Sequence, residues 1–462
     1  MYYRGFIQRL VSKYGGIPEL NAIASNLSLE SKTLSASTLK DQCADNRIIE
    51  LTAVSASKLP GKLCHAVLLS CHQTLIHLGD LSRYREEVLS KGECNWGPAI
   101  GYYGLAGAIY PTSGASHHQL AVIARHGGCH LRVTYHLYRA LATEEPFPTA
   151  RDNLELEIKK IETAQGKGKL LSEATIANNQ SPEKATIGLF MLLHSRLYNG
   201  SGVSEEELEN VVLTQLVTDL KERSMPGVLN KLVLINIAAQ DFASVRSQGG
   251  STDIMIDFQQ RLTSFTDEPR VIGYMRAFAS FLQLNVKTLI TLLHSLECEL
   301  TQPTDDANSS GLAQLKITAS TRRILPALRH YSSWLICNIN ILVEYTDQSR
   351  LGDLIKVFFG LYASTMTLLA STFDANSLPL IEYLLEEDED TIAFKPFREH
   401  DRSRYFEQGS GTLKQKFHTH GVERHHPNVE MLGRIRDLLT DAVALAVRDV
   451  GSIIPHFCRK LS

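Results

Sequence analysis

The chain has 462 residues and a formal net charge of −3, with 47 Lys and Arg against 50 Asp and Glu. This balance excludes a strongly basic protein whose affinity for nucleic acid comes from its overall charge. Hydrophobic residues make up 44% and charged residues 21%, which excludes a globally disordered chain. At ~150 residues per domain, the length predicts roughly two to three domains with a large core.

The cysteines and the hydropathy pattern further limit the class of protein. None of the eight cysteines forms a Cys-x-x-Cys pair, so we expect reduced, mostly buried thiols in an intracellular protein. The N-terminus lacks a secretory apolar run. The uncharged stretch from Val357 to Phe373 is shorter than the ~20 residues a bilayer requires, so it predicts a buried helix and no membrane partner.

Apolar residues recur at helical spacing along most of the chain, starting with a stripe from Tyr3 to Tyr14 that Gly15 and Gly16 end. Residues 25–60 are rich in Ser, Thr, Asn and Asp and predict a loop with short helices. Ser181-Pro182 and the capping box at Ser204 and Glu207 predict two helix starts. Further helices are expected over residues 62–87, 99–110, 115–126, 129–143, 154–171, 227–248, 252–264, 267–299, 311–347, 350–372 and 429–450. The pattern predicts an all-α chain of paired helices.

Weak helix-pair repeats occupy the first third of the chain. Leu78-Gly79 opens an early unit, and small or apolar residues then recur at tetratricopeptide spacing at Ala99, Tyr103, Ala106, Pro111, Leu120, Ala121, Val133, Leu137 and Ala140. Small residues at such positions let two helices approach closely, so that stacked pairs bury one continuous core.

Four segments from the same region resemble the Est/Smg family, which comprises telomerase-associated Est proteins and nonsense-mediated decay factors. They are His72–Glu86, Ala99–Gly114, His118–Ala124 and Arg139–Leu154, and they keep the order and spacing of the family. Beyond residue 154 the likeness is weaker but continues at Ile324–Pro326, Trp334–Leu335, Leu378–Leu385 and Ile392–Phe397.

The resemblance implies a domain order. We expect a 14-3-3-like, tetratricopeptide-type helical repeat domain over residues 1–152 and a helical-hairpin (α-solenoid) region of the Est/Smg DNA/RNA-binding type over residues 153–397. A polar, His-rich loop over residues 398–428 and a C-terminal helix over residues 429–462 follow. The family's pocket also uses a Lys from a helix that precedes the one opening this chain, so its N-terminal part is expected to be incomplete.

The resemblance also implies a phosphoserine pocket, with Arg83 and Tyr84 at the family's Arg-Tyr pair and Gln119 as a weaker candidate. An Arg fork can bind two oxygens of a phosphate that carries about −1.5 to −2 charge, and a Tyr hydroxyl adds a neutral donor. The alternative is that Arg83 pairs with Asp80 or Glu87 on its own helix, as exposed charges commonly do. His118, where relatives often carry Asn, departs from the family pattern.

Two further clusters have weaker interpretations. A solvated loop is favoured over a zinc site for His418, His420, His425 and His426, because no Cys or acidic residue has matching spacing. Single-stranded nucleic acid could bind the basic and aromatic residues Lys395, Phe397, Arg398, Arg402, Arg404, Tyr405 and Phe406. The neighbouring acidic run 386–390 offsets that charge, so a solvated charged surface is the favoured interpretation.

The function implied by the resemblance is a phosphoserine-binding adaptor of nonsense-mediated mRNA decay, recruiting decay machinery to a phosphorylated RNA helicase of the Upf-one type. Its further partners would be a family paralogue or mRNA-decay enzymes, in the cytoplasm and nucleus. The alternative is a telomerase-associated factor of the Est type that binds RNA or telomeric single-stranded DNA. A family member without phosphate affinity is a third possibility. No enzyme motif, cofactor site or metal site is predicted.

Overall fold

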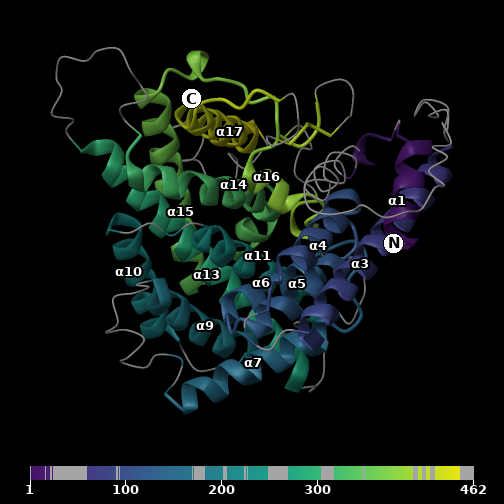
Figure 1. The fold of residues 1–462 in the computed structure, drawn as a ribbon. Helices are drawn as coiled ribbons and strands as arrows, with labels where there is room; N and C mark the ends of the chain where they lie inside the picture. The colour runs from purple at the N-terminus through teal and green to yellow at the C-terminus, as the bar shows by residue number, and fades with distance from the viewer. Residues whose placement is uncertain are drawn as a thin grey trace. The chain divides into compact units, whose positions relative to one another are not determined.

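The computed structural model describes residues 2–15, 17–20, 23, 60–89, 92, 94–168, 170, 183–200, 205–222, 225, 227–247, 269–302, 317–346, 349–398, 404–407, 413–416 and 422–447. Every regular element within these ranges is a helix, which confirms the all-α prediction (Figure 1). The chain divides into two compact units. The first contains residues 1–129, 139–150 and 419–421, and the second contains residues 130–138, 151–418 and 422–462.

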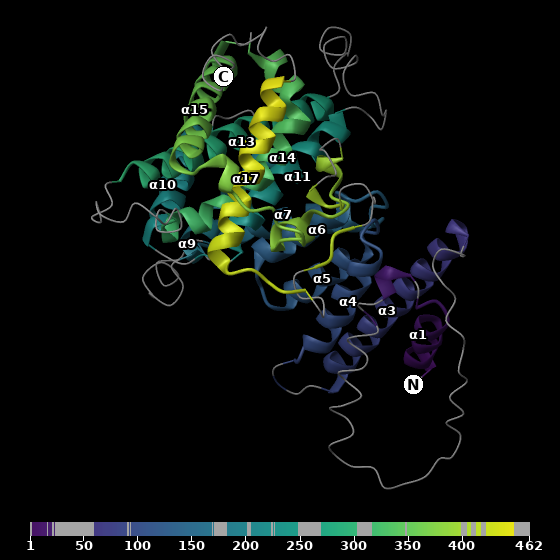
Figure 2. The ribbon, with the colours of Figure 1, turned by 90° about the horizontal axis from the view of Figure 1, so that it is seen from above.

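The first unit is built around a long helix, α3 (Gly61–Leu89), against which α1 (Tyr2–Lys13) and α4 (Gly97–Ile109) pack, while α5 (Ala115–His126) packs against α4. It also contains η1 (Pro18–Leu20). Helix α6 (His130–Leu141) has residues in both units. Helices α3 and α4 lie side by side, as both ribbon views show (Figures 1 and 2).

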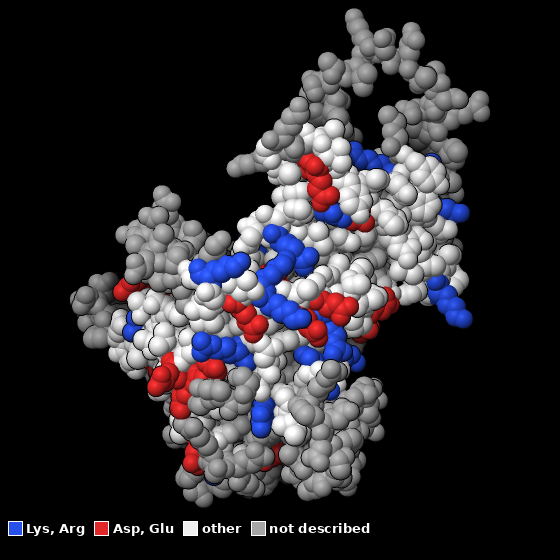
Figure 3. Space-filling view, turned by 90° about the horizontal axis from the view of Figure 1, so that it is seen from below, with Lys and Arg blue, Asp and Glu red and all other residues white. Residues whose placement is uncertain are grey.

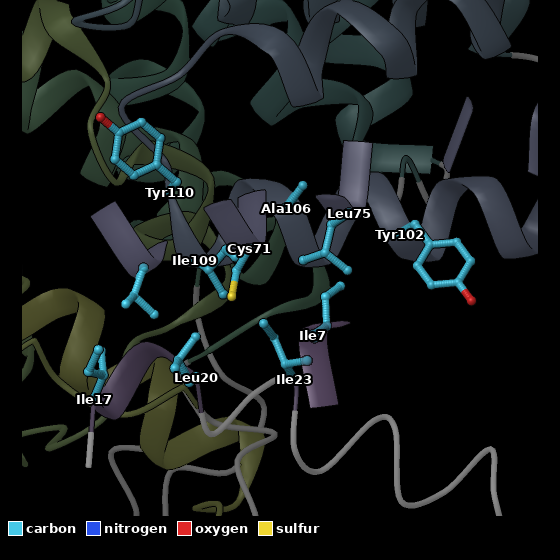
Figure 4. Packing of buried hydrophobic residues seen from close by; sticks show 11 residues of the cluster. Ile7, Ile17, Leu20, Ile23, Cys71, Leu75, Tyr102, Ala106, Ile109 and Tyr110 are labelled. Atoms are coloured by element: carbon cyan, nitrogen blue, oxygen red, sulfur yellow. The ribbon is translucent and has the colours of Figure 1, made fainter. Parts of the chain in front are cut away.

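The core of this unit lies where α1 and α4 meet α3. Ile7 from α1, Cys71 and Leu75 from α3, and Ala106 and Ile109 from α4 converge there, and each is buried (Figure 4). Burial of such side chains, at about 25 cal/mol per Å² of apolar surface, is what holds short helices together. Burial also raises the pKa of the Cys71 thiol to about 11, so this cysteine is held as an inert thiol.

The small residues of the repeat pattern are buried as expected. Ala99, Ala106, Ala121 and Ala140 are each at most 1% exposed. At Gly79 the helices approach so closely that a Cβ would overlap the ring of Tyr103. The repeat pattern therefore correctly predicted where the helices meet.

The second unit contains the remaining helices. They are α7 (Ala150–Gly166), α9 (Glu183–Asn199), α10 (Glu206–Glu222), α11 (Val228–Ser247), α13 (Pro269–Thr301), α14 (Ala319–Tyr345), α15 (Ser349–Thr372), η4 (Ala375–Ser377), α16 (Glu386–Thr391), η5 (Lys395–Phe397) and α17 (Pro427–Val447). Helix α13 packs against α11 and α15, and α14 packs against α17, which is the yellow helix of Figure 2.

Two helices of this unit, Val228–Arg246 and Leu351–Thr372, are long and apolar enough to cross a membrane by length and composition. The same test selects core helices, and 67% and 50% of their windows are buried inside the protein. Phe358, Phe359 and Tyr362 of the second one are at most 2% exposed. Their burial is that of core helices, as expected for the stretch from Val357 to Phe373.

Most expected helices are present, with shifted ends. The helix expected from residue 311 begins at Ala319, because the Thr318 hydroxyl caps it by accepting from the Thr321 backbone N–H at 3.1 Å. The helix expected from residue 154 begins at Ala150. The helix expected over 252–264, the loop at 25–59 and the starts predicted at Ser181-Pro182 and Ser204 lie outside the described residues.

The acidic run 386–390 is only partly solvated, which corrects part of the predicted solvated charged surface: Glu386 and Asp390 are exposed, but the residues between them are covered to different degrees. Its residues open α16, where Asp388 accepts from the Leu385 N–H at 3.0 Å, and carboxylates at a helix N-terminus are favoured by the helix dipole. Glu387 and Asp388 are each only 3% exposed. Their charges are met inside the protein by Arg329 of α14 and Arg434 of α17.

The basic cluster beside it is also partly internal. The guanidinium of Arg404 pairs with Asp441 and donates to the Ser333 hydroxyl at 2.9 Å. Phe397 and Tyr405 are buried. These side chains hold α14, α16 and α17 together, so they are unavailable to stack or pair with nucleic acid. Arg402 lies outside the described residues.

Candidate phosphate-binding site on helix α3

Arg83 and Tyr84 lie next to each other in the last two turns of α3. The Arg83 guanidinium lies over the Tyr84 ring, 4.3 Å from the ring centroid, an attractive cation–π arrangement. The Tyr84 residue is 50% exposed, whereas Arg83 is 8% exposed. The pair therefore presents an aromatic ring to solvent with a largely covered cation against it.

Arg83 is held by side chains from two helices. Its Nη1 donates to Glu87 at 2.9 Å, its Nη2 reaches Asp80 at 3.5 Å, and its Nε donates to the Tyr103 hydroxyl of α4 at 3.5 Å. The Tyr103 hydroxyl in turn donates to Asp80 at 2.7 Å. The intrahelical pairs weighed as the alternative for Arg83 are thus both present.

Tyr103 reaches the site because α4 lies so close to α3. Gly79 provides the space for its ring, and the hydroxyl then meets Asp80, the next residue of α3, and Arg83, one turn further along. Burial above all, together with the bond to Asp80, raises the pKa of Tyr103 well above its ordinary value, so it stays a neutral donor. The repeat pattern identified Tyr103 as a packing residue, but nothing in the sequence indicated its contact with Arg83.

Glu87 marks the outer limit of the site. Its carboxylate lies 2.9 Å from Arg83 and 3.5 Å from Nε2 of His126, at the end of α5. The His126 ring packs against the Trp96 ring with centroids 5.0 Å apart. Trp96 and His126 come from segments that the sequence did not connect with Arg83, and only the fold brings them together.

His118 is a buried neutral residue behind the site. Its ring stacks on Phe147 with centroids 4.0 Å apart, and its Nε2 lies 3.3 Å from the Thr149 hydroxyl. Burial, followed by the charge of Arg125, lowers the pKa of His118 to about 4. The neighbouring Gln119 is half-buried on α5, and within the described residues no hydrogen bond joins it to Arg83 or Tyr84.

The histidine-rich loop is described only in part. The His425 ring stacks on Tyr383 with centroids 5.8 Å apart, and its backbone N–H donates to the Tyr383 hydroxyl at 3.0 Å. His418 and His420 lie outside the described residues. Within the part of the chain that the structure describes, no group of three His, Cys, Asp or Glu could hold a metal ion.

The fold and the site together define a helical-repeat protein with an Arg-Tyr pair on one face of a long helix. A family model described as the Est1 DNA/RNA binding domain matches residues 99–401, and one described as telomerase activating protein Est1 matches residues 1–89. The chain therefore belongs to the Est1 family.

Curated relatives come from both branches of that family. A segment of 149 residues is 36% identical to nonsense-mediated mRNA decay factor SMG7 of Arabidopsis thaliana, covering 27% of this chain and 14% of that protein. A segment of 155 residues is 26% identical to telomere elongation protein est1 of Schizosaccharomyces pombe, covering 33% of this chain and 29% of that protein. The chain thus matches less than a third of either relative's length.

A solved structure supports the fold. A chain in the crystal structure of Est1 and Cdc13 superposes with a TM-score of 0.57, covering 99% of this chain and 85% of that one. The sequence identity is 14%, so this likeness concerns the fold. Together with the family models, it confirms the predicted membership and the all-α helical architecture.

Proposed function

We propose that the chain is a phosphoserine-binding adaptor of nonsense-mediated mRNA decay, with Arg83 as the phosphate ligand and Tyr84 beside it. The observation that supports this most is the preorganised guanidinium. Tyr103 and Asp80 fix Arg83 from one side, and the half-exposed Tyr84 ring lies against it. Binding of a phosphate would therefore cost little further side-chain entropy, because the Arg83 guanidinium is already held in place.

The partner would be a phosphorylated RNA helicase of the Upf-one type. The basis of this proposal is the similarity to plant SMG7, which is named as a nonsense-mediated mRNA decay factor. The second unit would recruit mRNA-decay enzymes or a family paralogue, in the cytoplasm and nucleus. Gln119 stays a weaker candidate for the same pocket.

The test is a fluorescence-anisotropy titration of the full chain with a labelled phospho-Ser-Gln peptide and its unphosphorylated twin. We expect binding of the phosphopeptide alone, and its loss in Arg83→Glu. Arg85→Glu is the matched control, because the Arg85 side chain is 56% exposed and pairs with Glu86 at 3.0 Å instead of contacting Arg83. Equal binding of both peptides to the folded wild type would contradict the proposal.

The Est branch supports a second candidate, a telomere-associated factor that binds RNA or single-stranded DNA. The observation in its favour is the match of residues 99–401 to the Est1 DNA/RNA binding domain. On the face shown in Figure 3, however, Lys and Arg side chains are intermixed with Asp and Glu. A labelled single-stranded oligonucleotide distinguishes the two. Its affinity would fall steeply with salt, and an uncharged peptide competitor would not displace it.

A further inference from the structure

Arg83 already has an anionic ligand, and it is supplied by its own helix. The Glu87 carboxylate lies 2.9 Å from Nη1 of Arg83, which is shorter than the 3.5 Å contacts of the same guanidinium with Asp80 and Tyr103. Resting on the proposed function, we propose that Glu87 is an internal competitor that an incoming phosphate must displace, so that it sets the affinity threshold of the site.

The two acids on Arg83 are placed differently. Asp80 is the inner one, with 19% of its side chain exposed, and it is also held by the Tyr103 hydroxyl at 2.7 Å. Glu87 is the outer one, with 31% of its side chain exposed. A ligand arriving from solvent therefore meets Glu87, while Asp80 and Tyr103 keep the guanidinium in place.

A second polar partner for the Glu87 carboxylate lies close to Arg83. Nε2 of His126 lies 3.5 Å from the same Glu87 oxygen, and the His126 side chain is 44% exposed. The His126 ring is also in contact with the Trp96 ring. A displaced Glu87 carboxylate thus keeps a polar partner within reach of its present position, and the exchange leaves no buried charge without a partner.

The exchange favours phosphate over a carboxylate on physical grounds. A ligand carboxylate would replace one single negative charge by another on the same Arg fork and gain little. A phosphoserine carries about −1.5 to −2 charge and three strong acceptor oxygens, so it gains more from the same guanidinium than Glu87 does. The wild-type site therefore binds a phosphopeptide and does not bind a peptide that carries Glu in place of phosphoserine.

The variant that tests this is Glu87→Gln, which keeps the shape of the side chain and removes its charge. We expect it to tighten binding of the labelled phospho-Ser-Gln peptide by roughly two- to fivefold, the upper part of the range that one partly exposed ion pair provides. A twin peptide with Glu in place of phosphoserine should become a measurable ligand. Both gains should disappear in the double variant with Arg83→Glu.

The matched control is Glu86→Gln. Glu86 is the adjacent residue, contacts Arg85 at 3.0 Å and accepts from the Asn95 N–H at 3.2 Å, so the charge change is the same without a contact to Arg83. It should leave the phosphopeptide affinity within about twofold of wild type, which is the scale of a screened surface charge. Equal tightening in both variants would overturn the competitor role.

The other outcomes separate this inference from the function on which it rests. If the wild type prefers the phosphopeptide but Glu87→Gln binds it equally or more weakly, then Glu87 orients Arg83, and the inference is wrong while the proposed function stands. If neither the wild type nor Glu87→Gln prefers the phosphopeptide over its unphosphorylated twin, both are wrong. Thermal melting of each variant checks that the fold is intact.

Discussion

Gly79 has no side chain at the point where the ring of Tyr103 lies against α3, and a Cβ there would overlap that ring. We expect Gly79→Ala to lower the free energy of unfolding by about 1–3 kcal/mol, the cost of overpacking a tight core. It should also weaken phosphopeptide binding, because Tyr103 would move away from Arg83. Urea denaturation and the anisotropy titration measure the two effects.

The control for Gly79→Ala is Gly101→Ala on the facing helix. An added Cβ at Gly101 meets nothing within 4 Å. Alanine is favoured over glycine inside a helix by about 0.8–1.0 kcal/mol, so this substitution should raise the stability instead. Opposite signs for the two glycines would show that close approach, and not helix propensity, determines the effect at Gly79. Equal signs would contradict it.

His118 links the stability of the first unit to pH. Its pKa is lowered to about 4 in the folded protein, mainly by burial, whereas an unfolded histidine titrates near 6.5. Between these values the unfolded chain binds the proton, so the free energy of unfolding falls as the pH is lowered from about 6.5 toward 4. We expect His118→Asn to reduce that slope, measured by urea denaturation at pH 7 and pH 5. An unchanged slope would contradict the assignment.

Only part of the site could be read from the sequence. The adjacency of Arg83 and Tyr84 and the pairs of Arg83 with Asp80 and Glu87 follow from helical spacing alone, because residues three and four apart share a face. Trp96, Tyr103 and His126 follow Arg83 by 13, 20 and 43 residues, and they lie just before α4, on α4 and at the end of α5. Their approach to α3 depends on helix packing, for which local sequence carries no signal.

At the scale of helices, a buried ionic network joins α14, α16 and α17. Arg329 of α14 lies 2.9 Å from Asp388 and 2.7 Å from Asp437, and Arg434 of α17 lies 2.7 Å from Glu387. Burial alone would raise the pKa of Glu387, but the two arginines hold it below its ordinary range. The network thus keeps a buried carboxylate ionised.

Arg329 is the cation that contacts Glu387, Asp388 and Asp437, so its removal leaves this buried cluster with an excess of negative charge. We expect Arg329→Met to lower the free energy of unfolding by about 3–5 kcal/mol, as for other broken buried ion pairs. Arg151→Met is the control, since Arg151 pairs with Glu155 on the surface at 3.4 Å, and its effect should stay within about 1 kcal/mol. Thermal or urea denaturation measures both, and similar losses would contradict the role of burial.

Helix periodicity predicted most elements of this unit, but the acidic run shows its limit. A block of five acids has the composition of a solvated surface, and nothing near it in sequence suggests otherwise. The arginines that neutralise it, Arg329 and Arg434, lie 58 and 47 residues away from Glu387. Local sequence patterns do not indicate a partner that lies so far along the chain. The burial of Glu387 could therefore be established only from the fold.

At the scale of the whole molecule, the two units are interleaved in sequence. Residues 139–150 belong to the first unit, where Glu145 exchanges backbone hydrogen bonds with Thr112 and Gly114 at 2.9 Å. Residues 130–138 belong to the second unit, where the Tyr138 hydroxyl lies 3.0 Å from His194. A domain boundary at 152, as expected from the family, therefore stays a prediction that cutting the chain can test.

A fragment of residues 1–152 would lose the second-unit partners of α6. We expect it to expose Tyr138 and the apolar residues beside it, and hence to aggregate or bind a hydrophobic dye that the full chain does not bind. A fragment of residues 1–129 would instead lack the segment around Glu145 that closes the first unit. Size-exclusion chromatography and dye fluorescence measure this, and a monomeric, cooperatively unfolding 1–152 fragment would contradict the prediction.

The buried network contributes little to the electrostatic potential outside the protein. Arg329, Arg404 and Arg434 count in the formal charge, as do Glu387, Asp388 and Asp441, yet all six are nearly covered. Opposite charges paired at contact distance form short-range multipoles whose potential decays quickly beyond the surface. A polyanion diffusing toward this protein is therefore guided by the remaining, exposed side chains, and a salt titration of the association rate would report on those alone.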